Sequence, residues 1–408
     1  MKRLAAARRE VIAAMPLLPE VATPLAGARG LVLSRPVVTP HPVPPFANSG
    51  VDGFAVRASD TAAAPVELAI VADIPAGTTS KTPVAPGTAA RIMTGAPLPE
   101  GADGVVMVED TETRNDRVRI LRSVTSGDHV RSAGGDFAAG SVALEAGHRL
   151  GPAHLGVLAS IGVAAPFVSR RPVVAVLSTG DEVQPAETAT LRPGAIRDAN
   201  RPMLVALLAD LGVEVRDLGI VPDDARLLRS VLDEAATTCD AVVTSGGVSV
   251  GEHDLVKRVL AELGRVEFWQ VAMQPAKPFA FGFLRKTPLF GLPGNPVSVL
   301  VAFEQFVRPA LLAAMGARRL FRPRIEVVLG EPVSTNPDKV VFLRVAFTGP
   351  GVVRSAGGQA SNVLSALAAA DAFAVIPVGV GRLGAGDRVT LELFHADESR
   401  TLAEADDD

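Results

Sequence analysis

Residues 240–254 read DAVVTSGGVSVGEHD, and this stretch decides the fold of the region around it. The apolar run at 241–243 predicts a buried strand, and the glycines that follow it predict a tight turn. A strand that ends in a glycine-rich turn leaves several backbone N–H groups free to face an anion. The glycines that allow the backbone to approach such an anion are Gly246, Gly247 and Gly251.

Polar side chains in the same stretch extend this prediction. Ser245 and Ser249 add hydroxyl donors. Glu252 and Asp254 follow the glycines, and carboxylates beside an anion site suggest a divalent cation next to a phosphate. The alternative is a strand-to-helix turn capped by acidic residues, and this segment alone does not separate the two interpretations.

Strand–helix alternation surrounds this stretch from residue 171 to residue 316. Asn200 is expected to cap one helix, Asp223 and Asp224 to open a second, and Asn295-Pro296 to start a long third one. This alternation predicts a doubly wound, mostly parallel α/β sheet, which binds ligands at the carboxyl ends of its strands. The expected strands are VVAVLST (173–179), VEVRDLGIV (213–221), DAVVTS (240–245), VEFWQVAM (266–273) and TPLFGLP (287–293).

The flanking regions have other patterns. Residues 51–145 and 322–396 are dense in short β-like runs with glycine and proline turns, and the second region is expected to form a small β-barrel or sandwich. The fold class is therefore multidomain α/β plus β. The expected divisions are 1–45 with 138–170 (a helical and extended N-terminal linker), 46–137 (β-rich), 171–317 (α/β), 318–396 (β-barrel-like) and 397–408 (an acidic tail).

Composition excludes several classes of protein. The 408 residues are 48% hydrophobic and 21% charged, which is typical of globular domains, and the net charge of −4 offers no basic surface for nucleic acid. The single cysteine, Cys239, excludes an internal disulfide and favours a cytoplasmic location. No membrane span is expected, because charged and proline residues interrupt the longest apolar candidate, 297–315.

Further polar turns fall within the α/β region. The segments STGDE (178–182), RDAN (197–200) and GLPGNP (291–296) suit ligand contacts, although each also suits a helix entry or cap. Asp223 and Asp224 suit a helix N-terminus equally well. Lys277 is a candidate phosphate contact, or otherwise a surface lysine. Together these turns predict a site at one edge of the sheet.

Seven motifs in order resemble the molybdopterin molybdenumtransferase family, which includes the E domain of gephyrin. The family is dimeric, and the resemblance implies insertion of molybdate into adenylylated molybdopterin with Mg²⁺-dependent release of AMP. It also implies a site shared between the α/β domain of one subunit and the β-rich domain of the other. The motifs are FANSGVDGFAVR (46–57), IMTGAPLPEGAD (92–103), VRSAGGDF (130–137), STGDEV (178–183), RDANR (197–201), SGGVSVGEHD (245–254) and GLPGNPVS (291–298).

The resemblance assigns roles to individual residues. Glu182, Asp223 and Asp254 match the α/β half of the site, with Glu182 and Asp254 as the Mg²⁺ ligands. Ser245, Gly246, Gly247, Ser249, Gly251 and Lys277 are expected to bind the substrate phosphates. Matches elsewhere are Asp52, Thr94 and Asp136 in the partner's half, Pro293 and Pro296 at the pterin pocket, and Arg344 and Ser361 at the molybdate site.

The chain also departs from the family pattern. Ala47, Val51 and Phe54 stand where the family usually has Asp, Met and Tyr, and Gln270 and Gln274 stand at positions that are often lysine. Oxyanion binding must therefore depend more on Lys277 and Arg344. Molybdate and tungstate are not separated by these motifs. Other functions considered are a molybdopterin adenylyltransferase and a non-enzymatic scaffold; an upstream adenylyltransferase is a further expected partner.

Overall fold

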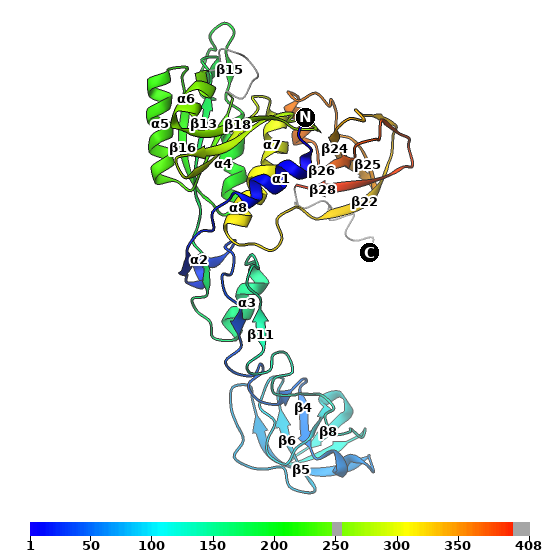
Figure 1. Ribbon diagram of the computed structural model, residues 1–408. Coiled ribbons are helices and arrows are strands. Elements are labelled where there is room, and N and C mark those ends of the chain that lie inside the picture. Colours follow the sequence, from blue (N-terminus) through cyan, green and yellow to red (C-terminus); the bar gives the residue numbers. More distant parts are fainter. Residues whose placement is uncertain (247–254, 395–408) are drawn as a thin grey trace.

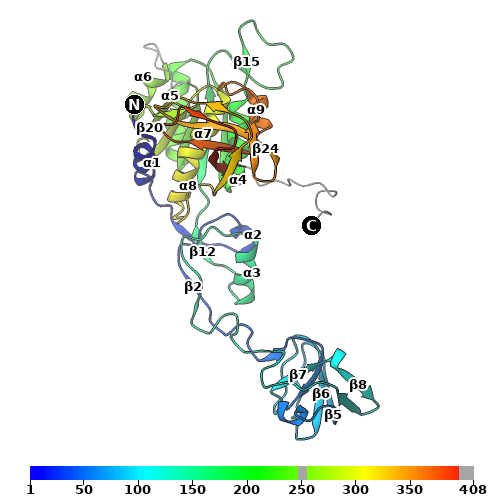
Figure 2. The same cartoon turned by 90° about the vertical axis from the view of Figure 1, so that its right-hand side faces the viewer.

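The computed structural model describes residues 1–246 and 255–394. The molecule is elongated (Figure 1). The α/β domain and the C-terminal β domain lie side by side at one end, and the β-rich domain lies at the other end, joined by a narrow linker (Figures 1 and 2). The predicted multidomain α/β plus β fold is confirmed.

A six-stranded sheet forms the centre of the α/β domain. The order is β16-β13-β17-β21-β20-β18, with β16 to β21 parallel and the β21–β20 and β20–β18 pairings antiparallel. The mostly parallel sheet is as predicted, but the sequence pattern did not predict β20. The strands are β13 (Val173–Thr179), β16 (Glu214–Val221), β17 (Ala241–Ser245), β18 (Gly264–Gln270), β20 (Pro278–Leu284) and β21 (Thr287–Leu292).

Helices cover both faces of this sheet because successive side chains of each strand point to opposite faces and apolar side chains lie on both. Val243 packs into the core shared with α4 (Asn200–Leu211), whereas Val242 packs toward α5 (Ala225–Thr238) and α6 (Leu255–Leu263). Asp224 caps α5, accepting from the backbone N–H groups of Arg226 and Leu227 at 2.8 and 3.0 Å. A small ladder of β14 (Val183–Gln184) and β15 (Ile196–Arg197) extends from the edge.

A long buried helix crosses the first of these faces. It runs as α7 (Pro296–Ala302), a π-helical turn (Phe303–Val307) and α8 (Arg308–Ala314). The π turn accommodates Pro309, which lacks an N–H group, so the predicted long helix continues through it. In the described part of the chain, this helix is long enough and apolar enough to cross a membrane (mean hydropathy 1.5). However, 89% of it is buried inside the protein.

The C-terminal domain is a closed barrel. Its sheet has the order β19-β24-β25-β22-β28-β26, and β24 also pairs with β26, which closes the ring. Strand β19 comes from the α/β region and pairs with β24, so it joins the two domains. The elements are β19 (Met273–Gln274), β22 (Arg324–Leu329), β23 (Val333–Ser334), β24 (Val340–Gly349), β25 (Val352–Ser355), α9 (Leu364–Ala368), β26 (Ala372–Ile376), β27 (Arg382–Leu383) and β28 (Arg388–Leu393).

The β-rich domain is a second six-stranded sheet, ordered β7-β4-β6-β5-β9-β8. Phe54 and Ala55 pack on its opposite faces, so each face has its own apolar core. The elements are β3 (Asn48–Ser49), β4 (Gly53–Val56), η1 (Ala58–Thr61), β5 (Val66–Ile74), β6 (Thr88–Ile92), β7 (Gly104–Met107), η2 (Val108–Asp110), β8 (Thr111–Arg114), β9 (Arg117–Ile120) and β10 (Val130–Arg131).

The linker is built from two distant segments of sequence. Strand β1 pairs with β12 and β2 pairs with β11, around a small core that includes Leu33 and Leu158. Helix α1 (Leu4–Ala13) lies outside it and packs into the α/β core through Ala7, whereas the sequence groups residues 1–45 with the linker. The linker elements are β1 (Glu20–Ala22), α2 (Leu25–Ala28), β2 (Val37–Val38), β11 (Val142–Leu144), α3 (Pro152–Ser160) and β12 (Phe167–Ser169).

Candidate active site

The sheet reverses its winding direction beside β13. The chain passes from β13 to β16 on one flank and then to β17 on the other flank. The ends of β13 and β17 therefore form a topological switch point, where open α/β sheets bind ligands. Ser178 lies opposite Ser245 in register, and Ser245 lies opposite Leu292 of β21. Three predicted ligand-binding turns thus begin side by side.

Gly246 is fixed at this edge by its backbone. Its N–H group donates to the Leu292 carbonyl at 3.2 Å, and its φ of +92° is unfavourable for residues with a side chain. A Cβ atom here would lie 2.8 Å from the Thr179 carbonyl oxygen. The glycine therefore brings the turn directly against the end of β13. Gly247, Ser249, Gly251 and Asp254, also predicted to contribute, lie outside the described residues.

Asn200 joins two of these turns, and the prediction that its side chain caps α4 is wrong. Its Nδ2 donates to Ser245 Oγ at 2.8 Å and to the Gly294 carbonyl at 2.7 Å. The first turn of α4 is instead satisfied by Asp198, whose Oδ1 accepts from the Arg201 N–H at 3.1 Å. Asn200 therefore connects the end of β17 to the loop that carries Pro293.

Three carboxylates gather at the ends of β13 and β16. The Asp223 backbone N–H donates to Asp181 Oδ1 at 3.1 Å. Loss of hydration raises the pKa of Asp223, and repulsion by Asp181 and then by Glu182 raises it further. Within residues 1–246 and 255–394, no three His, Cys, Asp or Glu side chains form a group that could hold a metal ion.

The C-terminal barrel meets the α/β domain at the start of α7. The Val297 N–H donates to the Ser361 carbonyl at 3.1 Å, so Ser361 lies beside Pro296. The Ala276 N–H approaches Ser298 Oγ at 3.3 Å, which places the segment before Lys277 against the same helix. Lys277 itself is exposed.

Arg344 lies behind the loop that contains Ser361, and its guanidinium is fully buried. Nη2 donates to the carbonyls of Gly358 and Ala360 at 2.6 and 3.2 Å. Nε and Nη1 have no hydrogen-bond partner among the described residues, and no ion pair found there involves Arg344. Burial lowers the pKa of this arginine. The alternative of a surface arginine is wrong, and what remains is a buried cation with two free donors.

Gln359 holds Arg344 in place, and sequence reasoning missed it. Its Oε1 accepts from the Arg344 N–H at 3.0 Å, and its Nε2 donates to the Arg344 carbonyl at 2.9 Å and to Ser355 Oγ at 2.8 Å. The pair Gly357-Gly358, directly before it, is the signal that could have directed attention to this loop.

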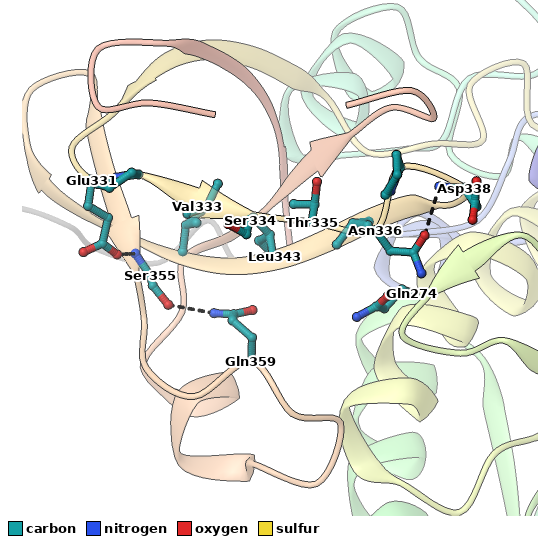
Figure 3. A pocket seen from close by; sticks show the side chains of 14 residues that line it. Gln274, Glu331, Val333, Ser334, Thr335, Asn336, Asp338, Leu343, Ser355 and Gln359 are labelled. Carbon is teal, nitrogen blue, oxygen red and sulfur yellow. Dashed lines mark hydrogen bonds between the residues drawn. The ribbon is translucent and has the colours of Figure 1, made fainter. Parts of the chain in front are cut away.

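Gln359 also lines a cavity of about 930 Å³ between the barrel and the α/β domain (Figure 3). Gln274 contributes from the α/β side, and Glu331 lies at the other end, where its Oε1 accepts from the Ser355 N–H at 2.8 Å. The lining combines neutral polar and apolar side chains with two carboxylates, Glu331 and Asp338. Gln274 can supply an amide donor to a bound group but no positive charge, whereas the Nε2 hydrogens of Gln359 are already used by protein acceptors.

The remaining predicted residues lie in the β-rich domain, far from the switch point (Figure 2). Asp52 Oδ1 accepts from the backbone N–H and the hydroxyl of Thr94, both at 2.7 Å. The N–H bond, and then the hydroxyl bond, lower the pKa of Asp52. The next residue, Gly53, must be a glycine, because any Cβ there would collide with the Val106 carbonyl. Asp136 is exposed, and its backbone N–H donates to the Val43 carbonyl.

Three known family regions match the chain in order. The MoeA N-terminal region (domain I and II) matches residues 2–162, a probable molybdopterin binding domain matches 175–313, and the MoeA C-terminal region (domain IV) matches 326–394. Nearly the whole chain is covered by these matches.

Curated relatives and solved structures agree with them. Molybdopterin molybdenumtransferase 2 of Mycobacterium tuberculosis is 41% identical over 380 residues, covering 90% of this chain and 94% of that protein. Molybdopterin molybdenumtransferase of Haemophilus influenzae is 37% identical over 374 residues, covering 90% and 92%. The crystal structure of a molybdopterin biosynthesis moeA protein from Pyrococcus horikoshii OT3 superposes with a TM-score of 0.84 at 28% identity, covering 97% and 100%. The similarity extends over all four parts of the fold.

Proposed function

Since the chain belongs to the molybdopterin molybdenumtransferase family and is a transferase of molybdenum cofactor biosynthesis, we propose that it inserts molybdate into adenylylated molybdopterin. In this reaction water attacks the phosphoanhydride bond and AMP leaves, while the dithiolene sulfurs bond to molybdenum and their protons leave with a molybdate oxygen as water. The proposed site must therefore hold two kinds of anion, a pyrophosphate and an oxyanion of the metal.

The buried guanidinium of Arg344 is the single observation that best supports this proposal. A buried charge without a counter-ion is unfavourable unless a ligand supplies the opposite charge. Nε and Nη1 have no partner in the described residues, so each could donate a hydrogen bond to an oxygen of a bound anion. We assign molybdate binding to Arg344 and Ser361, with Gln274 as a neutral donor at the neighbouring cavity and Gln359 holding Arg344 in place.

The switch point is the proposed position of the pyrophosphate. Gly246 brings the turn after β17 against the end of β13, and Ser245 supplies a hydroxyl there. We extend this phosphate site to Gly247, Ser249, Gly251 and Lys277, with Pro293 and Pro296 fixing the loop at the pterin end. These two positions place the leaving AMP at the strand ends and the incoming oxyanion at the barrel.

Mg²⁺ is proposed to bind the acidic residues of the same edge. The pKa of Asp223 is raised partly by Asp181 and Glu182, so a cation there would relieve the repulsion between these carboxylates. Glu182 and Asp254 are the residues we propose to hold it, with Asp223 beside them, and Mg²⁺ would supply positive charge to the phosphoanhydride. The carboxylates themselves would orient the substrate phosphates through that charge.

We propose that the working unit is a homodimer in the cytoplasm, which receives its substrate from an upstream adenylyltransferase. Asp52 and Thr94 form one hydrogen-bonded unit, but in the same chain they lie far from Arg344 (Figure 1). A second subunit could place its own Asp52, Thr94 and Asp136 over the switch point. The free cysteine, Cys239, is buried and fits a reducing compartment.

The direct test is AMP release from adenylylated molybdopterin in Mg²⁺ buffer, with and without molybdate. Wild-type protein is expected to release AMP faster with molybdate, and Arg344→Met to lose this dependence. Arg354→Met, an exposed arginine on the same barrel, serves as the matched control and should behave as wild type. Molybdate-independent AMP release by all three proteins would contradict the proposal.

A further inference from the structure

The two polar atoms of the Asn200 side-chain amide differ in their hydrogen bonding. Both Nδ2 hydrogens are used, one by Ser245 Oγ and one by the Gly294 carbonyl. Oδ1 is shielded from solvent and has no hydrogen-bond partner in the described part of the chain. Rotating the amide by half a turn would place Oδ1 against the Gly294 carbonyl oxygen, so the observed orientation is favoured and the position of Oδ1 is fixed.

An acceptor that is shielded from water and unpartnered is unfavourable, and such atoms in native proteins require an explanation. This atom lies at the switch point, where the ends of β17 and β21 meet. The Ser245 hydroxyl beside it already accepts from Asn200, and its own hydrogen has no acceptor among residues 1–246 and 255–394. An acceptor and a donor therefore stand next to each other, as in the edge of a base-recognition site.

We propose that Asn200 Oδ1 accepts a hydrogen bond from an amino group of the substrate's fused nitrogen ring, and that Asn200 is a specificity-determining residue. The inference rests on the proposed function, because adenylylated molybdopterin carries two such rings, a pterin and an adenine. Each ring bears an exocyclic amino group. The hydrogen bond forms when the ring binds at the strand ends and displaces the groups that shield Oδ1 from solvent.

Two ligand pairs separate this role from a merely structural one. AMP is compared with purine riboside 5′-monophosphate, which lacks the amino group of adenine. Pterin is compared with 4-oxopteridine, which lacks the amino group of pterin. We expect wild-type protein to prefer the amino form in one pair by about tenfold, as befits one hydrogen bond to a buried acceptor. The pair that shows the preference identifies the ring.

A variant of Asn200 then tests whether Oδ1 is responsible. Asn200→Ala should bind both members of that pair equally, because it removes the acceptor oxygen. Thr244→Val is the control: it removes a buried hydroxyl that has no partner in the described residues, from the residue before Ser245, whose side chain lies on the opposite face of the sheet. This control should leave the preference unchanged.

The outcomes are distinct. If Asn200 only connected the two loops, Asn200→Ala would weaken both members of a pair equally and leave their ratio as in wild type; that result would overturn the inference but not the proposed function. A bound water on Oδ1 predicts the same unchanged ratio. Failure of the wild-type protein to bind any of the four ligands would contradict the proposed function itself.

Discussion

Replacing Arg344 by methionine should separate oxyanion binding from the stability of the barrel. The arginine side chain is 0% exposed, so methionine occupies similar volume without exposing a new surface. The substitution removes the two hydrogen bonds from Nη2 to the carbonyls of Gly358 and Ala360. It also removes two buried donors, Nε and Nη1, that have no partner in the described residues.

These terms nearly cancel in the free energy of unfolding. Two hydrogen bonds from a charged donor contribute about 3–6 kcal/mol, and two unpartnered buried donors cost about 2–6 kcal/mol. We therefore expect the free energy of unfolding to change by less than about 2 kcal/mol, in line with other replacements of buried charges by apolar groups. Oxyanion binding, in contrast, loses a charge and two donors, which should weaken it by about 100-fold or more.

Two measurements on each protein check this separation. Thermal unfolding reports stability, and calorimetric titration with molybdate reports binding, in wild type, Arg344→Met and Arg354→Met. The expected result is a near-native melting temperature for all three proteins and lost molybdate binding only in Arg344→Met. Unchanged molybdate affinity in Arg344→Met would refute the reasoning, and so would a collapse of stability that alone explains the loss.

Three further predictions concern other parts of the site. Gly246→Ala should destabilise the protein by about 2–4 kcal/mol, because it adds a strained φ and a clash with Thr179, and urea unfolding measures this change; no change would contradict the turn geometry. Thr94→Val should raise the pKa of Asp52 toward its ordinary value, since one of two bonds to the carboxylate is lost. The stabilisation from the ionised Asp52 should then be lost at a higher pH as acid is added, which an NMR pH titration follows; an unchanged pKa would argue against the hydroxyl bond. Gln274→Lys should tighten molybdate binding several-fold by adding a positive charge at the cavity, and calorimetry that shows weaker binding would place the oxyanion elsewhere.

The sheet was predictable because its parallel strands are buried on both faces. Residues 241–245 are buried at every position, and such strands appear in sequence as continuous apolar runs. Strand β20 was missed because it begins at Pro278, directly after Lys277, which suggests a turn, and its pairing with β18 and β21 depends on distant residues. The long helix predicted to start at Asn295-Pro296 is present, but its π turn is not visible in a pattern of 3.6-residue periodicity.

The site was predictable only in part, since sequence motifs name residues without fixing their partners. Asn200 stands where a capping residue is expected, but Ser245 and Gly294, 45 and 94 residues away, take its amide hydrogens. The burial of Arg344 follows from closure of the barrel, which no local pattern reports. Gln359 acts through Arg344, so neither its spacing nor its residue type indicates its role.

Mixing two inactive variants tests most directly whether one complete site is built from two chains. Asp52→Asn and Arg344→Met should each abolish molybdate-dependent AMP release. In an equal mixture of the two chains, about half of the dimers pair different chains, and each of these has one intact site of two. The account predicts recovery of about a quarter of wild-type AMP release in that mixture. A mixture as inactive as its parents would contradict the shared site and, with it, the roles proposed for both residues.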